Sequence, residues 1–414
     1  MSLALTDLKI TPMSHYFPNG SNHANRLAGA VDWLGHKLTY TISLALMDVT
    51  KIFRAIHLDL HDQCTKVPYE IGMRMLRASR VVILMPINLT IGLVGVALRA
   101  LATFARTDMT FVAPKTLPLS SEPCKKLRVR TFNVAMTPNF ITVPNGVRPV
   151  DERIKEVANA MIARLSAGDH ITCVQELFHT EAAEYLVQRL KKEFPDLFII
   201  YNVAHNRLVL NSGLLIASKY PLTAPLFWKS PRSEGYSTFA NIGHLIVTVL
   251  LSSTQKLVLS NTHLNTDGDQ LSDNYTGAKC RKEQFQYIET HMQEYLVQNP
   301  SQNNLNLIGY LHSGDFNMDL DEEWSKCKEL QENYEHNFSA QQHNRPTVFD
   351  TRKYPTCWDT KRIDQWKGSM DEQVDYVLVP KKYSETIKGT MHFDDMEGSS
   401  DHRAVVADLT IQNP

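Results

Sequence analysis

LIGYLHSGDFN (residues 307–317) is an apolar run of strand length that ends in a cluster of polar side chains. Asp315 and Asn317 lie two positions apart, so in an extended chain both side chains point to the same side. Gly314 allows the backbone at this point to approach a ligand closely. Alone, residues 314–317 are equally compatible with a turn. Their interpretation therefore depends on whether the pattern recurs elsewhere in the chain.

The pattern recurs at five other predicted strand ends. The other pieces are Asn133, Gln175-Glu176, Thr262-His263, Asp375-Tyr376 and Ser400-Asp401-His402. Each supplies a carboxylate, a carboxamide or an imidazole, the groups that bind a hard cation and transfer protons beside a phosphate. Together the six pieces predict a metal-dependent enzyme that cleaves a phosphodiester.

A Mg²⁺ ion prefers oxygen ligands and keeps several waters, so one or two carboxylates from separate strand ends are enough to hold it. Glu176, which follows the apolar run 171–174, is the best ligand candidate. The carboxamide of Asn133 would lie beside it if the two strands are neighbours. His402 has a side chain that can take a proton from water near neutral pH, as a general base must.

The remaining polar residues are less specific when each is taken alone. His263 lies near the end of the apolar strand 257–264, where a histidine is more often part of a core than a catalyst. Asp401 is adjacent to His402, so the two cannot form a conventional dyad unless the backbone turns, and Asp401 is expected to orient another histidine. Asp375 places a carboxylate in an apolar strand, which is costly without a partner.

Length, charge and cysteine content narrow the classes of protein. At 414 residues the chain has room for more than one domain. The 43 Lys and Arg against 44 Asp and Glu give no basic field, so nucleic acid is not favoured as a partner. Six cysteines spread singly indicate thiols, with neither a zinc site nor a disulfide framework. The first nine residues are too short and polar for a secretory signal peptide.

Residues 1–106 differ from the rest of the chain. Residues 81–98 contain eighteen positions without a charge, and arginines flank them on both sides. Pro86 and Asn88 favour a kinked or re-entrant segment over a straight span. Residues 27–56 carry apolar side chains at helical spacing. An ordinary helical cap is one interpretation; association with a membrane surface through residues 27–106 is favoured, because soluble helices rarely contain so long an apolar run.

A proline-rich stretch, 107–125, has the composition of a linker, and residues 126–414 then alternate between strand and helix patterns. Strands are predicted at 126–135, 171–177, 213–218, 241–251, 256–264, 305–313, 374–379 and 403–411, and a long helix at 278–297. Two antiparallel sheets packed face to face with helices outside account for this α/β order, and so does a doubly wound sheet.

The order of the six pieces resembles the endonuclease/exonuclease/phosphatase superfamily, which is DNase I-like, and within it the neutral sphingomyelinases. Four further stretches are similar to motifs of that branch: 175–178, 211–221, Arg281 with Gln284, and 356–359. The resemblance covers about residues 126–411. The sequence differs from that branch at Ser212, which stands where the branch has the first glycine of a Gly-Gly pair.

The resemblance implies a four-layered α/β sandwich of two mainly antiparallel sheets with the site at one end. It implies Mg²⁺, with Mn²⁺ as an alternative, at Glu176 with Asn133 close by. It also implies roles for six other residues: Asp315 and Asn317 orient the phosphate and the attacking water, His263 contacts the scissile phosphate, His402 is the general base, and Asp401 and Asp375 support the histidines. The implied substrate is a membrane phospholipid, with sphingomyelin cleaved to ceramide and phosphocholine.

Three other functions stay open from the sequence. The stretch 356–362 is only superficially similar to the signature of inositol polyphosphate 5-phosphatases, and the basic-aromatic clusters typical of a DNase I-like nuclease are missing. A membrane-bound interaction protein with an inactive domain is the alternative that involves no catalysis. Secreted bacterial sphingomyelinases touch the bilayer with an aromatic hairpin; the matching stretch 389–399 is poor in aromatics, so the N-terminal region could replace that anchor.

Overall fold

The computed structural model describes two compact units of the chain, one of residues 1–107 with 138–144 and 206–208, and one of the other residues from 108 onward. The described residues are 31, 34–35, 38, 63–103, 108–114, 119–138, 147–204, 210–266, 275–299, 305–318, 334–335, 348–349, 370–372 and 374–412. The motif predicted at 356–359 and most of the helix predicted at 27–56 lie outside them.

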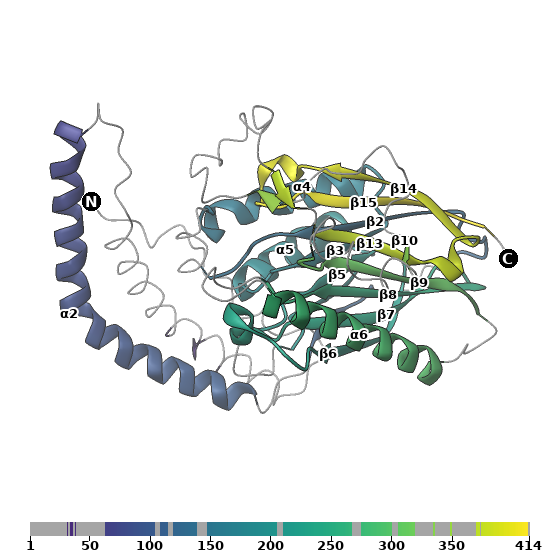
Figure 1. Cartoon of the computed structure of the whole chain (residues 1–414), viewed down its shortest axis with the longest axis horizontal. Coiled ribbons are helices and arrows are strands. Elements are labelled where there is room, and N and C mark those ends of the chain that lie inside the picture. Colours follow the sequence, from purple (N-terminus) through teal and green to yellow (C-terminus); the bar gives the residue numbers. More distant parts are fainter. Residues whose placement is uncertain are drawn as a thin grey trace. The chain divides into compact units, whose positions relative to one another are not determined.

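Two sheets form the second unit (Figure 1). The first has the order β1 (Thr110–Val112), β4 (Phe198–Tyr201), β5 (Leu215–Ser218), β3 (Ile171–Gln175), β2 (Lys126–Asn133), β15 (Ala404–Ile411) and β14 (Ile387–Asp394). The second has the order β10 (Tyr334–Glu335), β13 (Asp375–Pro380), β9 (Asn306–Asp315), β8 (Gln255–His263), β7 (Gly243–Leu250) and β6 (Leu222–Lys229). The short strands β11 (Val348–Phe349) and β12 (Met370–Glu372) pair with each other.

Each large sheet is built around one parallel pair of strands. β2 and β3 are parallel and are joined through α4 (Val150–Ser166), and β8 and β9 are parallel and are joined through α6 (Tyr275–Gln298). The other pairs within the two large sheets are antiparallel. The sheets are therefore mainly antiparallel, as predicted, and the alternative of a doubly wound sheet is wrong.

Three buried clusters define the layers. Inward-facing residues such as Val129 and Leu259 form the core between the two sheets. A second cluster packs α4 and α5 (Thr180–Glu193) on the outer face of the first sheet, and a third packs α6 on the outer face of the second. The order helix, sheet, sheet, helix matches the predicted four layers.

Two stretches differ from their predicted structure. Residues 110–112, inside the expected linker 107–125, form β1 and pair with β4 at the edge of the first sheet. Residues 387–394 form β14, an edge strand paired along its whole length with β15. Residues 110–112 are too few to show an alternation. Residues 387–394 do alternate, but Gly389 stands at one of the apolar places, so the strand pattern is weaker than in the central strands. The described part of the unit also contains three short helical turns: η3 (Gly235–Phe239), η8 (Lys381–Tyr383) and η9 (Met396–Gly398).

Among its described residues, the first unit contains one long helix, α2 (Gln63–Thr103), which is continuous through Pro86 and bends along its length (Figure 1). A re-entrant segment, one of the predicted forms, is therefore wrong. Residues Val81–Ala102 are long and apolar enough to cross a membrane, and most of their large side chains are exposed. Within this stretch the Thr90 hydroxyl donates to the carbonyl of Pro86, so that polar group is satisfied inside the helix.

Candidate active site

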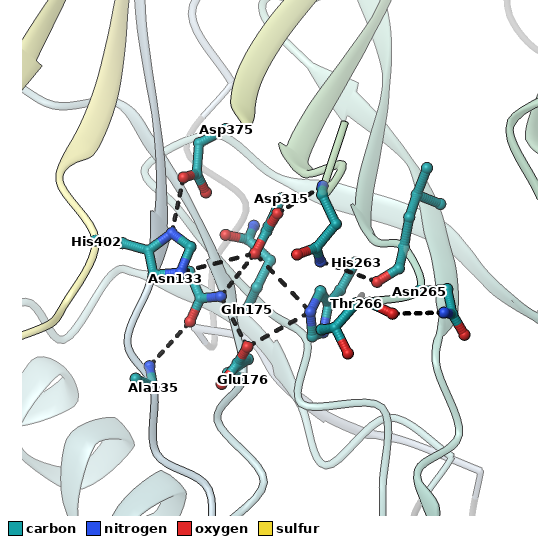
Figure 2. Close-up of polar contacts among 12 residues, drawn as sticks. Asn133, Ala135, Gln175, Glu176, His263, Asn265, Thr266, Asp315, Asp375 and His402 are labelled. Carbon is teal, nitrogen blue, oxygen red and sulfur yellow. Dashed lines mark hydrogen bonds and ion pairs between the residues drawn. The ribbon is translucent and has the colours of Figure 1, made fainter. Parts of the chain in front are cut away.

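Strand register brings three predicted site residues together at one end of the second sheet. His263 ends β8 and lies opposite Asp315, which ends β9. Asp375 begins β13 and lies opposite Asp315 on its other side. In the first sheet, Asn133 at the end of β2 lies opposite Gln175 at the end of β3. Both sheets therefore present their polar residues at the same end of the sandwich (Figure 2).

Asn133 joins the two sheets. Its Nδ2 donates to Asp315 Oδ2 at 2.8 Å and to Glu176 Oε1 at 3.0 Å, while its Oδ1 accepts from the amide of Ala135 at 2.9 Å. Because the Ala135 amide can only donate, it holds the carboxamide oxygen away from the carboxylates. In this geometry Asn133 orients the two carboxylates, and its oxygen is not directed at a cation beside them.

Glu176 leaves the end of β3 in an unusual backbone conformation. Its φ is +57°, in the left-handed region that costs energy for a residue with a side chain. Gly213 packs directly against this bend, since a Cβ on it would lie 3.1 Å from Glu176 Cα. Burial raises the pKa of the Glu176 carboxyl, an effect that the nearby His263 opposes. The site therefore holds a carboxylate in a place where its charge calls for a positive partner.

His402 and Asp375 form a buried dyad. His402 Nδ1 lies 2.8 Å from Asp375 Oδ2, and its Nε2 faces Asp315 Oδ2 at 4.0 Å. Burial alone would lower the pKa of His402, but the charge of Asp375 and its hydrogen bond outweigh this and hold that pKa well above its usual range. Asp375 fixes the ring through Nδ1, which leaves Nε2 for proton transfer.

His263 faces the same carboxylates from the second sheet. Its Nε2 lies 3.5 Å from Glu176 Oε1 and 3.9 Å from Asp315 Oδ2. Neither ring nitrogen has a hydrogen-bond partner among the residues that the structure describes, although the side chain is only 3% exposed. A buried imidazole without a partner is costly. This one is placed to meet a ligand that enters between the carboxylates.

Asp315 and Asn317 surround the turn after β9. The amide of Asn317 donates to Asp315 Oδ1 at 2.8 Å, so both oxygens of that carboxylate are hydrogen-bonded. Asn317 has φ +50° and donates through Nδ2 to the carbonyl of Leu264 at 3.1 Å. Burial, and next the charge of Asp375, raise the pKa of Asp315. The turn therefore fixes Asp315 in the centre of the site.

Gly314 makes this turn possible, and Gly314→Ala is expected to destabilise the fold by at least about 2 kcal/mol. Its φ is +154°, and a Cβ there would lie 2.0 Å from the backbone oxygen of Thr262, which cannot move without breaking the β8–β9 ladder. Urea denaturation measures the loss. Gly168→Ala is the matched control: φ is +119° but the nearest atom is 3.8 Å away, so that variant reports backbone strain without the clash. Equal losses in the two variants would contradict the clash.

Asp401 takes a different position from the one predicted. It accepts a hydrogen bond from the Ser400 hydroxyl at 3.2 Å, and its charge helps to raise the pKa of both Glu176 and His402. The partner of His402 in the structure is Asp375. Among the residues that the structure describes, no hydrogen bond joins Asp401 to a histidine.

The donor set fits a hard divalent cation. Ligand atoms of Glu176, His263 and Asp315 lie within 4.8 Å of one another, and so do those of Asp315, Asp375 and His402. Carboxylate oxygens are the preferred ligands of Mg²⁺ and Mn²⁺. The raised pKa values of Glu176 and Asp315 point the same way, because buried carboxyl groups without enough positive charge resist ionisation.

Sequence reasoning missed the polar bridge under the site. Gln175 Nε2 donates to Asn261 Oδ1 at 2.7 Å, and Asn261 Nδ2 donates to the carbonyls of Val174 and Leu215 at 3.0 Å each. This network ties the first sheet to β8 directly behind the site residues. The sequence did hold a signal for this network: Gln175 and Asn261 are amide side chains next to apolar runs, and each lies shortly before a predicted site residue.

Solved structures share the fold of the chain. No protein-family profile matches the chain, and no curated protein matches it. The chain is similar to SmcL with 17% identity and a TM-score of 0.51, covering 69% of this chain and 99% of that one. It is similar to the beta toxin of Staphylococcus aureus with 16% identity, a TM-score of 0.50 and coverage of 68% and 99%. It is also similar to sphingomyelinase C from Streptomyces griseocarneus with 18% identity and a TM-score of 0.50, covering 69% of this chain and 99% of that one.

At these identities the likeness establishes the fold and nothing finer. The second unit has the DNase I-like α/β sandwich, so the fold expected from the resemblance to the endonuclease/exonuclease/phosphatase superfamily is confirmed. A shared fold does not specify an activity, so the chemistry of the site depends on its own residues.

Proposed function

We propose that the chain is a Mg²⁺-dependent phosphodiesterase that hydrolyses a membrane phospholipid, with sphingomyelin as substrate and ceramide and phosphocholine as products. The observation that carries the proposal is the His402–Asp375 dyad facing Asp315 and Glu176 at the end of the sandwich. A base with a free nitrogen next to a cluster of carboxylates suits attack of water on a phosphodiester.

The residues divide the chemistry among them. His402 accepts the proton of the attacking water at Nε2, and Asp375 stabilises the imidazolium that forms. His263 is placed to donate to a phosphoryl oxygen, because neither ring nitrogen forms a hydrogen bond to another described residue. Glu176 and Asp315, held by Asn133, would bind the cation. The bound cation would offset negative charge on the phosphoryl oxygens and the leaving group.

The choice of a phospholipid rests on the motif resemblance and on α2. The connection that matches the bacterial aromatic hairpin offers no membrane anchor: Met391 and Met396 are buried, and Phe393 packs against the core between the sheets. By contrast, the apolar segment Val81–Ala102 of α2 has 22 residues. At 1.5 Å per residue it is about 33 Å long, close to the thickness of a bilayer core.

Lysines in the middle of that segment are expected to release the protein from membranes. Leu93 and Val94 are both more than half exposed, and each charge at the centre of a span costs about 2.5–3.5 kcal/mol. We expect Leu93→Lys with Val94→Lys to lower the liposome-bound fraction at least about tenfold in flotation assays. Leu76→Lys, at an exposed position of α2 outside Val81–Ala102, is the control and should bind as the wild type does. Unchanged binding of the double variant would refute the role of α2.

A panel of substrates tests the proposal. The purified full chain is incubated with sphingomyelin, phosphatidylcholine, a phosphoinositide or plasmid DNA, each with Mg²⁺ or with a chelator. Release of phosphocholine from sphingomyelin with Mg²⁺ is the expected result. Loss of phosphate from the phosphoinositide would favour a 5-phosphatase, cut plasmid would favour a nuclease, and inactivity on all four would favour an interaction protein.

A further inference from the structure

Arg153 is a fully buried arginine behind the candidate active site. It lies in the first turn of α4, and its side chain is 0% exposed. No carboxylate forms an ion pair with it among the residues that the structure describes. Burial lowers the pKa of Arg153 to about 10, against an opposing effect of Asp401, so the guanidinium stays protonated at neutral pH. A buried cation without a carboxylate partner is expensive, which indicates a specific task.

The guanidinium donates to four backbone carbonyls. Nε donates to Arg148 O at 2.9 Å, Nη1 to Val134 O and to Ser399 O at 2.9 Å each, and Nη2 to Ala135 O at 2.5 Å. Two of these carbonyls follow β2 and one precedes β15. The planar fork of an arginine is suited to such a set, because its donors point in fixed directions.

The hydrogen bonds replace a strand ladder that has ended. β2 and β15 are antiparallel neighbours, and their register ends with Thr131 opposite Val405. Beyond that pair the two strands are no longer paired, so the backbone carbonyls of the segments that follow β2 and precede β15 need other hydrogen-bond donors. Arg153 supplies three such bonds, and the Ser400 hydroxyl adds one to Asn133 O at 2.7 Å.

One arm of this network leads to the carboxylates. Ala135 has φ +48°, a strained conformation for a residue with a Cβ, and Arg153 holds its carbonyl. In that conformation the Ala135 amide donates to Asn133 Oδ1 and so fixes the carboxamide that donates to Glu176 and Asp315. A change at Arg153 would therefore reach each carboxylate through three successive hydrogen bonds.

The other arm leads to the base. Arg153 donates to the carbonyl of Ser399. The hydroxyl of the next residue, Ser400, accepts a hydrogen bond of 3.2 Å from the backbone amide of His402. His402 is thus fixed at its backbone by this arm and at its ring by Asp375. The two arms start from the same guanidinium.

We propose that Arg153 is a positioning residue that holds the carboxylates and the general base in register with each other. The inference rests on the proposed function in so far as these groups act on a phosphodiester. Arg153 itself is not directed at substrate or cation, because four of its five N–H donors are taken by backbone carbonyls and its side chain is 0% exposed.

Arg153→Lys in the full chain tests the inference, since lysine keeps the charge but loses the fork. We expect the dissociation constant for Mn²⁺ to rise about 10–100-fold. With bis(p-nitrophenyl) phosphate we expect kcat to fall about 100-fold with KM unchanged. The downfield proton NMR signal of the His402–Asp375 hydrogen bond should disappear; it is assigned by its absence in His402→Gln. The control is Arg128→Lys, on β2 in an exposed pair with Asp408, and it should leave all three readouts unchanged.

The outcomes separate the inference from the proposed function. A wild type that cleaves no phosphodiester, with the NMR signal still lost in Arg153→Lys, would reject the function and retain the inference. A variant that only melts earlier, with Mn²⁺ affinity, kcat and NMR signal at wild-type values, would overturn the inference. If Arg153→Lys does not fold, Ser400→Ala removes the other tie between the two loops without removing a charge. That variant should show smaller changes in the same three readouts, and wild-type values would likewise overturn the inference.

Discussion

His402→Gln is expected to lower kcat for sphingomyelin hydrolysis about 10³-fold, since a positioned general base contributes about 10²–10⁴-fold. Glutamine can keep a hydrogen bond to Asp375 but cannot accept the proton of the attacking water. Initial rates of phosphocholine release with saturating Mg²⁺ measure the effect. His392→Gln is the matched control, because His392 lies on the edge strand β14, away from the site, and pairs with Asp408 of β15. A kcat within about tenfold of the wild type would show that another group is the base.

The pH dependence gives the same residue a second test. The pKa of His402 is held above its usual range mainly by Asp375, so the active, unprotonated form appears only as the pH rises. Rates should therefore decline toward acid pH. Asp375→Asn removes that charge and lowers the pKa of His402, so the acidic decline should move to lower pH while the maximal rate falls. If the rate of Asp375→Asn declines over the same pH range as that of the wild type, protonation of His402 does not control the decline.

Glu176→Gln is expected to weaken Mn²⁺ binding by more than about 100-fold and to abolish hydrolysis with Mg²⁺ at millimolar concentration. Glutamine has the size of glutamate and keeps an oxygen for the bond from Asn133, so the geometry is preserved while the charge is lost. Isothermal titration with Mn²⁺ measures the binding. Glu184→Gln is the control: that carboxyl is also buried, and burial raises its pKa to about 7, but it is bonded to Tyr201 and Asn202 outside the site.

Thermal unfolding separates loss of binding from loss of fold. Burial raises the pKa of Glu176, so at neutral pH its ionised form is unfavourable in the metal-free protein, and Glu176→Gln should be at least as stable as the wild type. Mg²⁺ at about 100 times its dissociation constant should stabilise the wild type by about 2.7 kcal/mol and the variant by almost nothing. Equal stabilisation of both proteins would place the cation elsewhere.

The sequence predicted the strands that carry the site because their patterns are strong. β3, β8 and β13 are central strands in which every residue is buried, and each contains an apolar run next to a predicted site residue. Edge strands were missed, since β1 and β14 are only partly covered. The strand order within each sheet needed the structure, because strand patterns do not specify which strands pair.

Within the site, the sequence predicted the residues better than their contacts. Asn133 and Asp315 are 182 positions apart, and nothing local indicates that they share a hydrogen bond. Asp401 and Asp375 were both expected to support histidines, but the sequence did not show that Asp375, 27 positions from His402, is the partner of that histidine. Arg153 was missed because a charged residue in the first turn of an amphipathic helix normally faces solvent.

Hydrolysis of sphingomyelin in water enriched in ¹⁸O tests the central claim most directly. The full chain is incubated with sphingomyelin vesicles and Mg²⁺, and both products are analysed by mass spectrometry. Attack of water on phosphorus, with His402 as base, predicts one ¹⁸O atom in phosphocholine, none in ceramide, and no product with a chelator. Absence of phosphocholine, ¹⁸O in ceramide, or release that continues with the chelator would contradict a metal-dependent phosphodiesterase at this site.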